Sequence, residues 1–167
     1  VLGSAEAGIK VILYKVNAID PTDVEMLNEY YFETMHHEFA HILHQKKNYP
    51  TEYNQISAAD YSSTGWQNRT EQQAWKLGFV TPYAGMEPQE DFVEVIANYL
   101  VKPDGFWENM LANAGTEGAT KIQTKFDMVK EWLMTAWNID IDELRTIIIR
   151  RSGDIDSILN EKIAYNE

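Results

Sequence analysis

The segment His37-Glu38-Phe39-Ala40-His41 constrains this chain more than any other, and all four histidines of the chain lie between residues 36 and 44. Residues four apart on a helix lie one turn above each other, so His37 and His41 can both reach one Zn²⁺ at ~2.0 to 2.1 Å. Glu38 then lies beside the metal, where it can take a proton from water. The spacing predicts a zinc site on a helix. The alternatives are a solvent-exposed helix face with clustered histidines and no metal, and a site that binds metal but catalyses no reaction.

Composition narrows the class of protein. With 167 residues, 44% of them hydrophobic, the chain has enough apolar material for one folded domain. A formal charge of -12 makes nucleic acid and anionic membrane surfaces poor partners. The chain has no cysteine, so a metal must be held by histidines and carboxylates. No apolar run approaches the roughly 18 to 20 residues that span a bilayer.

The hydrophobic pattern predicts one strand followed by helices, with a long irregular stretch over residues 46–66. The strand is expected over residues 8–17, which are rich in β-branched residues. Helices are expected over residues 23–45, 70–77, 90–101, 106–114, 120–137, 141–150 and 155–164. We therefore predict a single α+β domain over residues 1–167, mostly helical, with a small N-terminal sheet and a helical C-terminal lobe over residues 104–167. Because the chain begins at Val1 without Met, we expect further residues upstream.

A hydrolytic zinc site needs a third protein ligand and an open position for water. His44 is a poor candidate, because the seven residues from His37 rise about 10.5 Å along a helix. His44 is kept as an alternative zinc ligand or as a residue that hydrogen-bonds a ligand. Glu90 and Glu94 share a face of the helix over residues 90–101, so one can bind the metal while the other supports a ligand histidine. Asp91 lies off that face, and all three acids also suit the first turn of any helix.

The residues from Tyr83 to Glu94 resemble a segment of the catalytic domain of anthrax lethal factor, and with His37 to His41 they resemble the gluzincin metallopeptidases. In that segment a tyrosine precedes the ligand glutamate by seven residues, and a second glutamate follows it by four. The resemblance implies that Glu90 is the third zinc ligand, that Glu94 supports a ligand, and that Tyr83 stabilises the oxyanion of the intermediate. The alternative for Tyr83 is a packing role.

A second resemblance covers most of the chain. Ala5-Glu6-Ala7-Gly8, the stretch VILYKVN and the stretch HHEFAHILHQ are similar to zinc-binding metallopeptidase lipoproteins of nutrient import systems in Bacteroidetes-type bacteria. This resemblance implies export, a lipid anchor at the cell envelope, and a link to an outer-membrane nutrient import complex. The lipidated cysteine of that family is absent from this sequence.

Together these features predict a zincin-like, zinc-dependent peptidase. Zn²⁺ is bound by His37, His41 and Glu90, Glu38 is the general base, and the substrate is a peptide or protein. The first alternative is a zinc-binding module without proteolytic activity, or a hydrolase of non-peptide amides, in a cell-envelope uptake system. The second is a metal-free helical interaction subunit that uses the five tryptophans to contact a partner.

Overall fold

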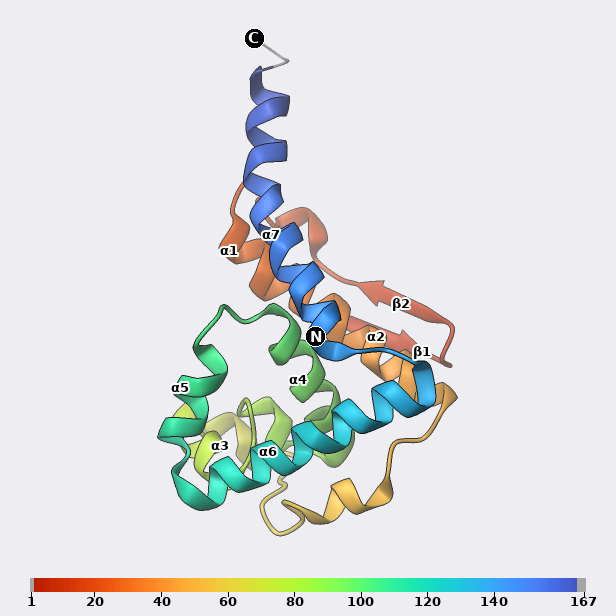
Figure 1. The fold of residues 1–167 in the computed structure, drawn as a ribbon, viewed down its shortest axis with the longest axis vertical. Coiled ribbons are helices and arrows are strands. Elements are labelled where there is room, and N and C mark those ends of the chain that lie inside the picture. The colour runs from red at the N-terminus through yellow and green to blue at the C-terminus, as the bar shows by residue number, and fades with distance from the viewer. Residues whose placement is uncertain (1, 165–167) are drawn as a thin grey trace.

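The computed structural model describes the backbone of residues 2–164 and the side chains of residues 2–154. The fold is α+β and mostly helical, with one small sheet at its N-terminal end (Figure 1). Its elements are β1 (Gly3–Glu6), β2 (Lys10–Leu13), α1 (Val24–Leu27), α2 (Glu33–Lys46), α3 (Glu71–Leu77), α4 (Pro88–Val101), α5 (Phe106–Asn113), α6 (Gly115–Trp132) and α7 (Ile141–Ala164). Residues 1 and 165–167 of the predicted domain lie outside the described residues.

The sheet is an antiparallel hairpin of β1 and β2, in register from Gly3 opposite Leu13 to Glu6 opposite Lys10. Ala7 and Gly8 at its turn both have positive φ, as the tight turns that suit the twist of a hairpin require. The strand predicted over residues 8–17 was therefore too long. It ends at Leu13, because Lys15 adopts a left-handed conformation before a 3-10 turn.

The helix predicted over residues 23–45 is confirmed as one continuous helical stretch. Asp23 caps its start by accepting a hydrogen bond from the backbone N–H of Met26. The stretch then runs through α1, a π-helical segment (Asn28–Phe32) and α2. The buried side of α2 carries the histidine cluster, and its buried residues are His37, Glu38, Ala40, His41, Leu43 and His44.

The helix α4 lies at the centre of the fold. The pattern of its sequence suggests one apolar face, whereas the structure buries every residue from Asp91 to Asn98, because α2, α6 and α7 all pack against it. Pro88 stands in its first turn, where the missing N–H removes no helical hydrogen bond. Glu90 and Glu94 are thereby placed on a rigid, buried element facing α2.

The helix α3 packs against α6, which in turn packs against α4. The helix α3 begins with a capping box of Thr70 and Gln73 and ends at Gly78, which has a φ of 89°. It packs against α6 at Gly118, where a Cβ atom would lie 2.2 Å from the backbone oxygen of Trp75. Only glycine permits this close approach of the two helices.

The C-terminal part differs from the sequence prediction in two ways. The helix α6 begins at Gly115, five residues earlier than expected. The helix α7 runs unbroken through Gly153, where two helices were predicted; a glycine inside a helix costs only about 1 kcal/mol relative to alanine. The helix α7 contacts α1 and α4, the helix α6 contacts α3, α4 and α5, and an ion pair of Lys130 with Asp142 joins α6 to α7. The C-terminal lobe and the single-domain organisation stay predictions.

A buried ion pair joins α6 to the first turn of α4. Lys125 and Asp91 have no exposed side-chain surface, and the ammonium lies 2.6 Å from Asp91 Oδ2. The hydroxyl of Tyr61 donates to the same oxygen at 2.7 Å, and Lys125 also donates to the backbone oxygen of Gly78. Removal of one partner would leave a buried charge without compensation.

We expect Lys125→Met to lower the free energy of unfolding by about 3 to 5 kcal/mol, because Asp91 would stay buried without its counter-charge. The matched control is Lys121→Met, one turn earlier on α6, which loses only partly exposed pairs with Asp60 and Glu117 and should cost at most about 1 kcal/mol. Chemical denaturation measures both. Equal losses in the two variants would contradict a special role of the buried pair.

Candidate metal centre

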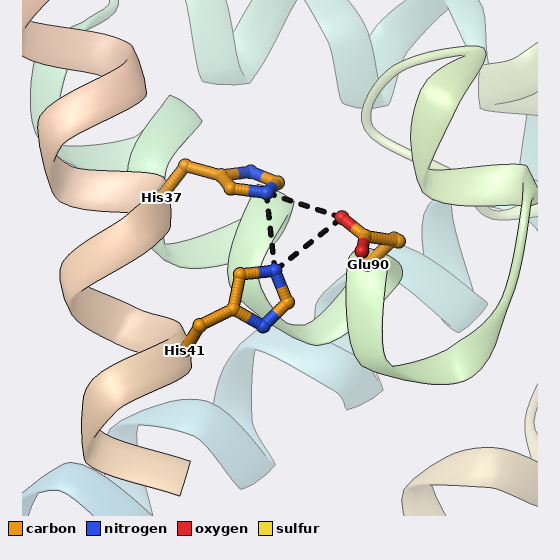
Figure 2. Close-up of side chains that lie close together, drawn as sticks. All are labelled: His37, His41 and Glu90. Carbon is orange, nitrogen blue, oxygen red and sulfur yellow. Dashed lines mark hydrogen bonds and ion pairs between the residues drawn. The ribbon is translucent and has the colours of Figure 1, made fainter. Parts of the chain in front are cut away.

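His37 and His41 on α2 point toward Glu90 on α4, and the three side chains meet at one point (Figure 2). The Nε2 atoms of His37 and His41 lie 3.2 Å apart. Glu90 Oε2 lies 3.1 Å from the first and 3.4 Å from the second. Three atoms of the kinds that bind zinc thus form a nearly equilateral triangle.

These distances fit a tetrahedral metal site. Ligand atoms ~2.0 to 2.1 Å from a tetrahedral zinc ion lie about 3.3 Å from one another. Glu90 Oε2 is buried and, among the residues whose side chains are described, has no hydrogen-bond partner of good geometry. Its lone pairs are therefore free for a shared central atom. Two imidazoles and one carboxylate form a donor set that zinc prefers, with a fourth position left for water.

Glu94 lies one turn after Glu90 and supports His37. Its Oε1 atom accepts a hydrogen bond of 2.7 Å from His37 Nδ1, which leaves Nε2 of that ring directed at the metal group. Its Oε2 atom accepts from Thr81 Oγ1 at 2.5 Å and from Asn98 Nδ2 at 3.4 Å. Both oxygens of Glu94 thus accept hydrogen bonds, whereas it is Glu90 Oε2 that lies with the two imidazole nitrogens in a group that could hold a metal.

Sequence reasoning missed Thr81 and Asn98. Asn98 follows Glu94 by four residues on one helix face, so helical spacing was a signal that could have found it. Thr81 lies in the turn-rich link before α4, and only the folded chain brings it to Glu94. The two residues hold the carboxylate that in turn orients His37.

His44 does not join the group of three metal-facing atoms. Its Nε2 atom lies 2.8 Å from Nδ1 of His41, on the side of that ring opposite the metal group. Burial, with the neighbouring His41, lowers the pKa of His44 to about 4. The ring is therefore neutral near pH 7.

Glu38 lies next to the metal group, beneath strand β1. It is buried, and a Cβ atom at Gly3 would lie 2.8 Å from Glu38 Oε1. Glycine at this position thus lets the strand approach the glutamate. Burial raises the pKa of Glu38, although His37 and His41 oppose the shift. A carboxylate with a raised pKa is a better proton acceptor at neutral pH.

The metal group opens into a cleft of about 870 Å³. Residues 3–5 of strand β1 line it together with Leu2, and Glu29, Tyr30, Trp66 and Tyr83 lie in its walls. The Tyr83 ring lies 6.0 Å from the His37 ring and has the edge of Trp66 against it at 5.0 Å. Burial, with the nearby Glu90, raises the pKa of Tyr83, so its hydroxyl stays protonated and can donate a hydrogen bond.

The charges of the site depend on one another. Burial alone would lower the pKa of His37, but the nearby carboxylates of Glu90 and Glu94 raise it to about 10. The pKa of Glu90 falls despite burial, because the two imidazoles stabilise its charged form. Without a metal, His37 therefore carries a proton at neutral pH.

A small sheet beside a helix with two metal-facing histidines, and a glutamate on a second helix, define a zincin-like protein. Residues 1–142 match the family described as "Putative zinc-binding metallo-peptidase", and the chain belongs to that family.

A crystal structure at 2.10 Å resolution of a "putative zinc-binding metallo-peptidase" from Bacteroides caccae ATCC 43185 is similar, with 52% sequence identity and a TM-score of 0.83. The match covers 94% of this chain and 60% of that one, so this chain spans less than two thirds of the length of that protein. No match was found among curated proteins.

The family supports the class of protein predicted from the sequence. The finer predictions, namely the likeness to lethal factor, the lipid anchor and the nutrient import system, stay predictions. Within residues 2–164, no helix combines the length and the apolar character that a membrane crossing requires.

Glu90 and Glu94 can be separated by zinc affinity. We expect Glu90→Gln to abolish tight zinc binding, because it removes a charged ligand, whereas Glu94→Gln should weaken binding by about 10 to 100-fold. Glu87→Gln, an exposed residue just before α4, is the matched control and should change nothing. Chelator competition measures the affinities. A larger loss in Glu94→Gln than in Glu90→Gln would reverse the assignment.

Zinc affinity should rise with pH. Because His37 holds a proton below a pKa of about 10, zinc must displace that proton to bind. Each unit of pH between 6 and 8 should therefore increase the affinity by about tenfold for one displaced proton. Chelator competition at pH 6, 7 and 8, corrected for the titration of the chelator, gives the slope. An affinity that is constant over this range would rule out proton displacement.

Proposed function

We propose that this chain is a zinc-dependent peptidase of the gluzincin type. Zinc would be held by His37, His41 and Glu90, with Glu38 as general base. The observation that carries the proposal is the triangle of ligand atoms, 3.1 to 3.4 Å on a side, at the wall of a cleft that also holds Glu38. The family to which the chain belongs supports the same chemistry.

Bound zinc supplies Lewis acidity, which polarises the scissile carbonyl and makes water more acidic. Glu38 accepts a proton from the attacking water and delivers it to the nitrogen of the leaving amine, so water is added across the peptide bond. Its burial suits this exchange, because a carboxylate with a raised pKa takes and returns a proton more readily at neutral pH. Glu94 keeps His37 oriented during the reaction.

Tyr83 is the proposed oxyanion donor. It lines the cleft beside His37, and its hydroxyl retains its proton because its pKa is raised. A hydroxyl at this place can donate to the oxygen that becomes negative when water attacks the carbonyl. The packing of Trp66 against the ring would hold it in position.

An extended peptide is the proposed substrate. Strand β1 pairs with β2 on one side only within the described residues, and it lines the cleft beside the metal group. An unpaired strand edge can bind a peptide by main-chain hydrogen bonds, in the way that added strands do. Export, lipid anchoring and a link to nutrient import are also proposed, and they rest on the sequence resemblance alone.

Glu38→Gln tests the catalytic proposal. We expect it to retain zinc and to lower peptide hydrolysis by about 10² to 10⁴-fold, because the amide cannot accept the proton of water. Glu29→Gln, at an exposed glutamate in the same cleft, is the control and should keep most of the activity. A broad peptide library with product detection by mass spectrometry gives the rates, and elemental analysis gives the zinc content.

The same experiment separates the alternatives. Wild-type protein that holds zinc but cleaves no peptide would overturn the peptidase proposal in favour of a binding module or a hydrolase of other amides. Wild-type protein without affinity for zinc would support a metal-free interaction subunit.

A further inference from the structure

His41 has a second ring nitrogen, and this atom meets a third histidine. Nδ1 of His41 and Nε2 of His44 lie 2.8 Å apart, and both residues are only 8% exposed. We propose that His44 is a positioning residue that fixes the metal-binding tautomer of His41. The inference rests on the proposed function in one respect, because it requires His41 to be a zinc ligand.

A hydrogen bond between two imidazole nitrogens holds one proton, and the position of that proton decides whether His41 can bind metal. If His41 Nδ1 donates to His44 Nε2, then His41 Nε2 carries a lone pair directed at the metal group. If His44 donates instead, the proton of His41 lies on Nε2 and blocks that position. Metal binding therefore requires His44 to be the acceptor, with its own proton on Nδ1.

The structure holds His44 where this acceptor is needed. His44 follows His41 by three residues, so both rings project from the same side of α2. The ring of Tyr49 packs against His44 at 5.7 Å and 84°, and Tyr49 itself stacks on the buried Phe92 of α4 at 4.3 Å. The acceptor is thus fixed by the same core that positions Glu90.

The two ligand histidines have supports of different charge. His37 donates to the carboxylate of Glu94, whereas the hydrogen-bond partner of His41 is the imidazole of His44. Glu38, Glu90 and Glu94 already bring three carboxyl groups to the site. A neutral acceptor orients His41 without adding a fourth negative charge, which would be costly in this buried place.

Zinc affinity of two His44 variants tests the proposal. His44→Phe keeps a ring in the aromatic pocket but removes the acceptor, and it should weaken zinc binding by about 10 to 100-fold. His44→Gln places an amide oxygen near the position of Nε2, and it should restore the affinity to within about threefold of the wild type. His36→Phe, the same substitution next to the ligand His37, is the matched control and should leave the affinity unchanged.

The outcomes distinguish this inference from the proposed function. A wild type without affinity for zinc overturns both. A wild type that binds zinc tightly, together with a His44→Phe variant of equal affinity, overturns the inference alone. Equal losses in His44→Phe and His44→Gln also overturn it, because the hydrogen-bond acceptor would then not be the property that matters.

Nitrogen NMR of the zinc-loaded wild type gives a test that depends on no substitution. With ¹⁵N-labelled histidine, His41 should carry its proton on Nδ1, and His44 should also carry its proton on Nδ1 and have an unprotonated Nε2. A proton on Nε2 of His44 would overturn the proposal. The tautomers are read directly, so the test stands even if His44→Phe fails to fold.

Discussion

The packing of α2 against α4 is the constraint on which the site depends. His37 and His41 come from one helix and Glu90 from the other. The two Nε2 atoms and Glu90 Oε2 form a triangle with sides of 3.1 to 3.4 Å. One turn of slip would move Glu90 about 5.4 Å and destroy that arrangement. Ala40, Leu43, Phe92 and Val93 are buried in one apolar core, which resists such a slip because close-packed interiors deform little. The register of two helices thus determines the geometry of the metal site.

His37 and His41 each have a hydrogen-bond partner at Nδ1, the ring nitrogen that faces away from the metal group, and different parts of the chain hold these two partners. Glu94 orients His37 and is itself held by Thr81 from the link before α4. His44 meets His41 from within α2 and is packed by Tyr49 from the loop that follows. The irregular segments on either side of α3 therefore contribute to the site through these supports.

Much of the fold was predictable from local patterns, because the helices carry their own signals. Helix starts are signalled by residues close in sequence, namely the cap at Asp23, the capping box at Thr70 and the proline at position 88. Strand β1 was not predictable, since Gly3–Glu6 has small and polar residues and forms a strand only by pairing with β2. The choice of Glu90 over Glu94 as the metal-facing carboxylate came from a resemblance, because spacing places both on one face. Thr81 was beyond prediction, since its contact depends on the whole chain.

The first turn of α4 shows how the fold and the site share one anchor. Glu90 and Asp91 are consecutive, so their side chains leave the helix about 100° apart and enter different surroundings. Asp91 is neutralised by Lys125 inside the core, which fixes the turn, and Glu90 is thereby presented to the two histidines. Each buried carboxylate needs a positive partner. The positive partner of Asp91 is always Lys125. The positive partner of Glu90 is either protonated His37 or a metal ion, so the proton and the metal compete for the same position. In the first turn of α4, Asp91 thus has a fixed counter-charge that stabilises the fold, and Glu90 has an exchangeable counter-charge that suits a metal site.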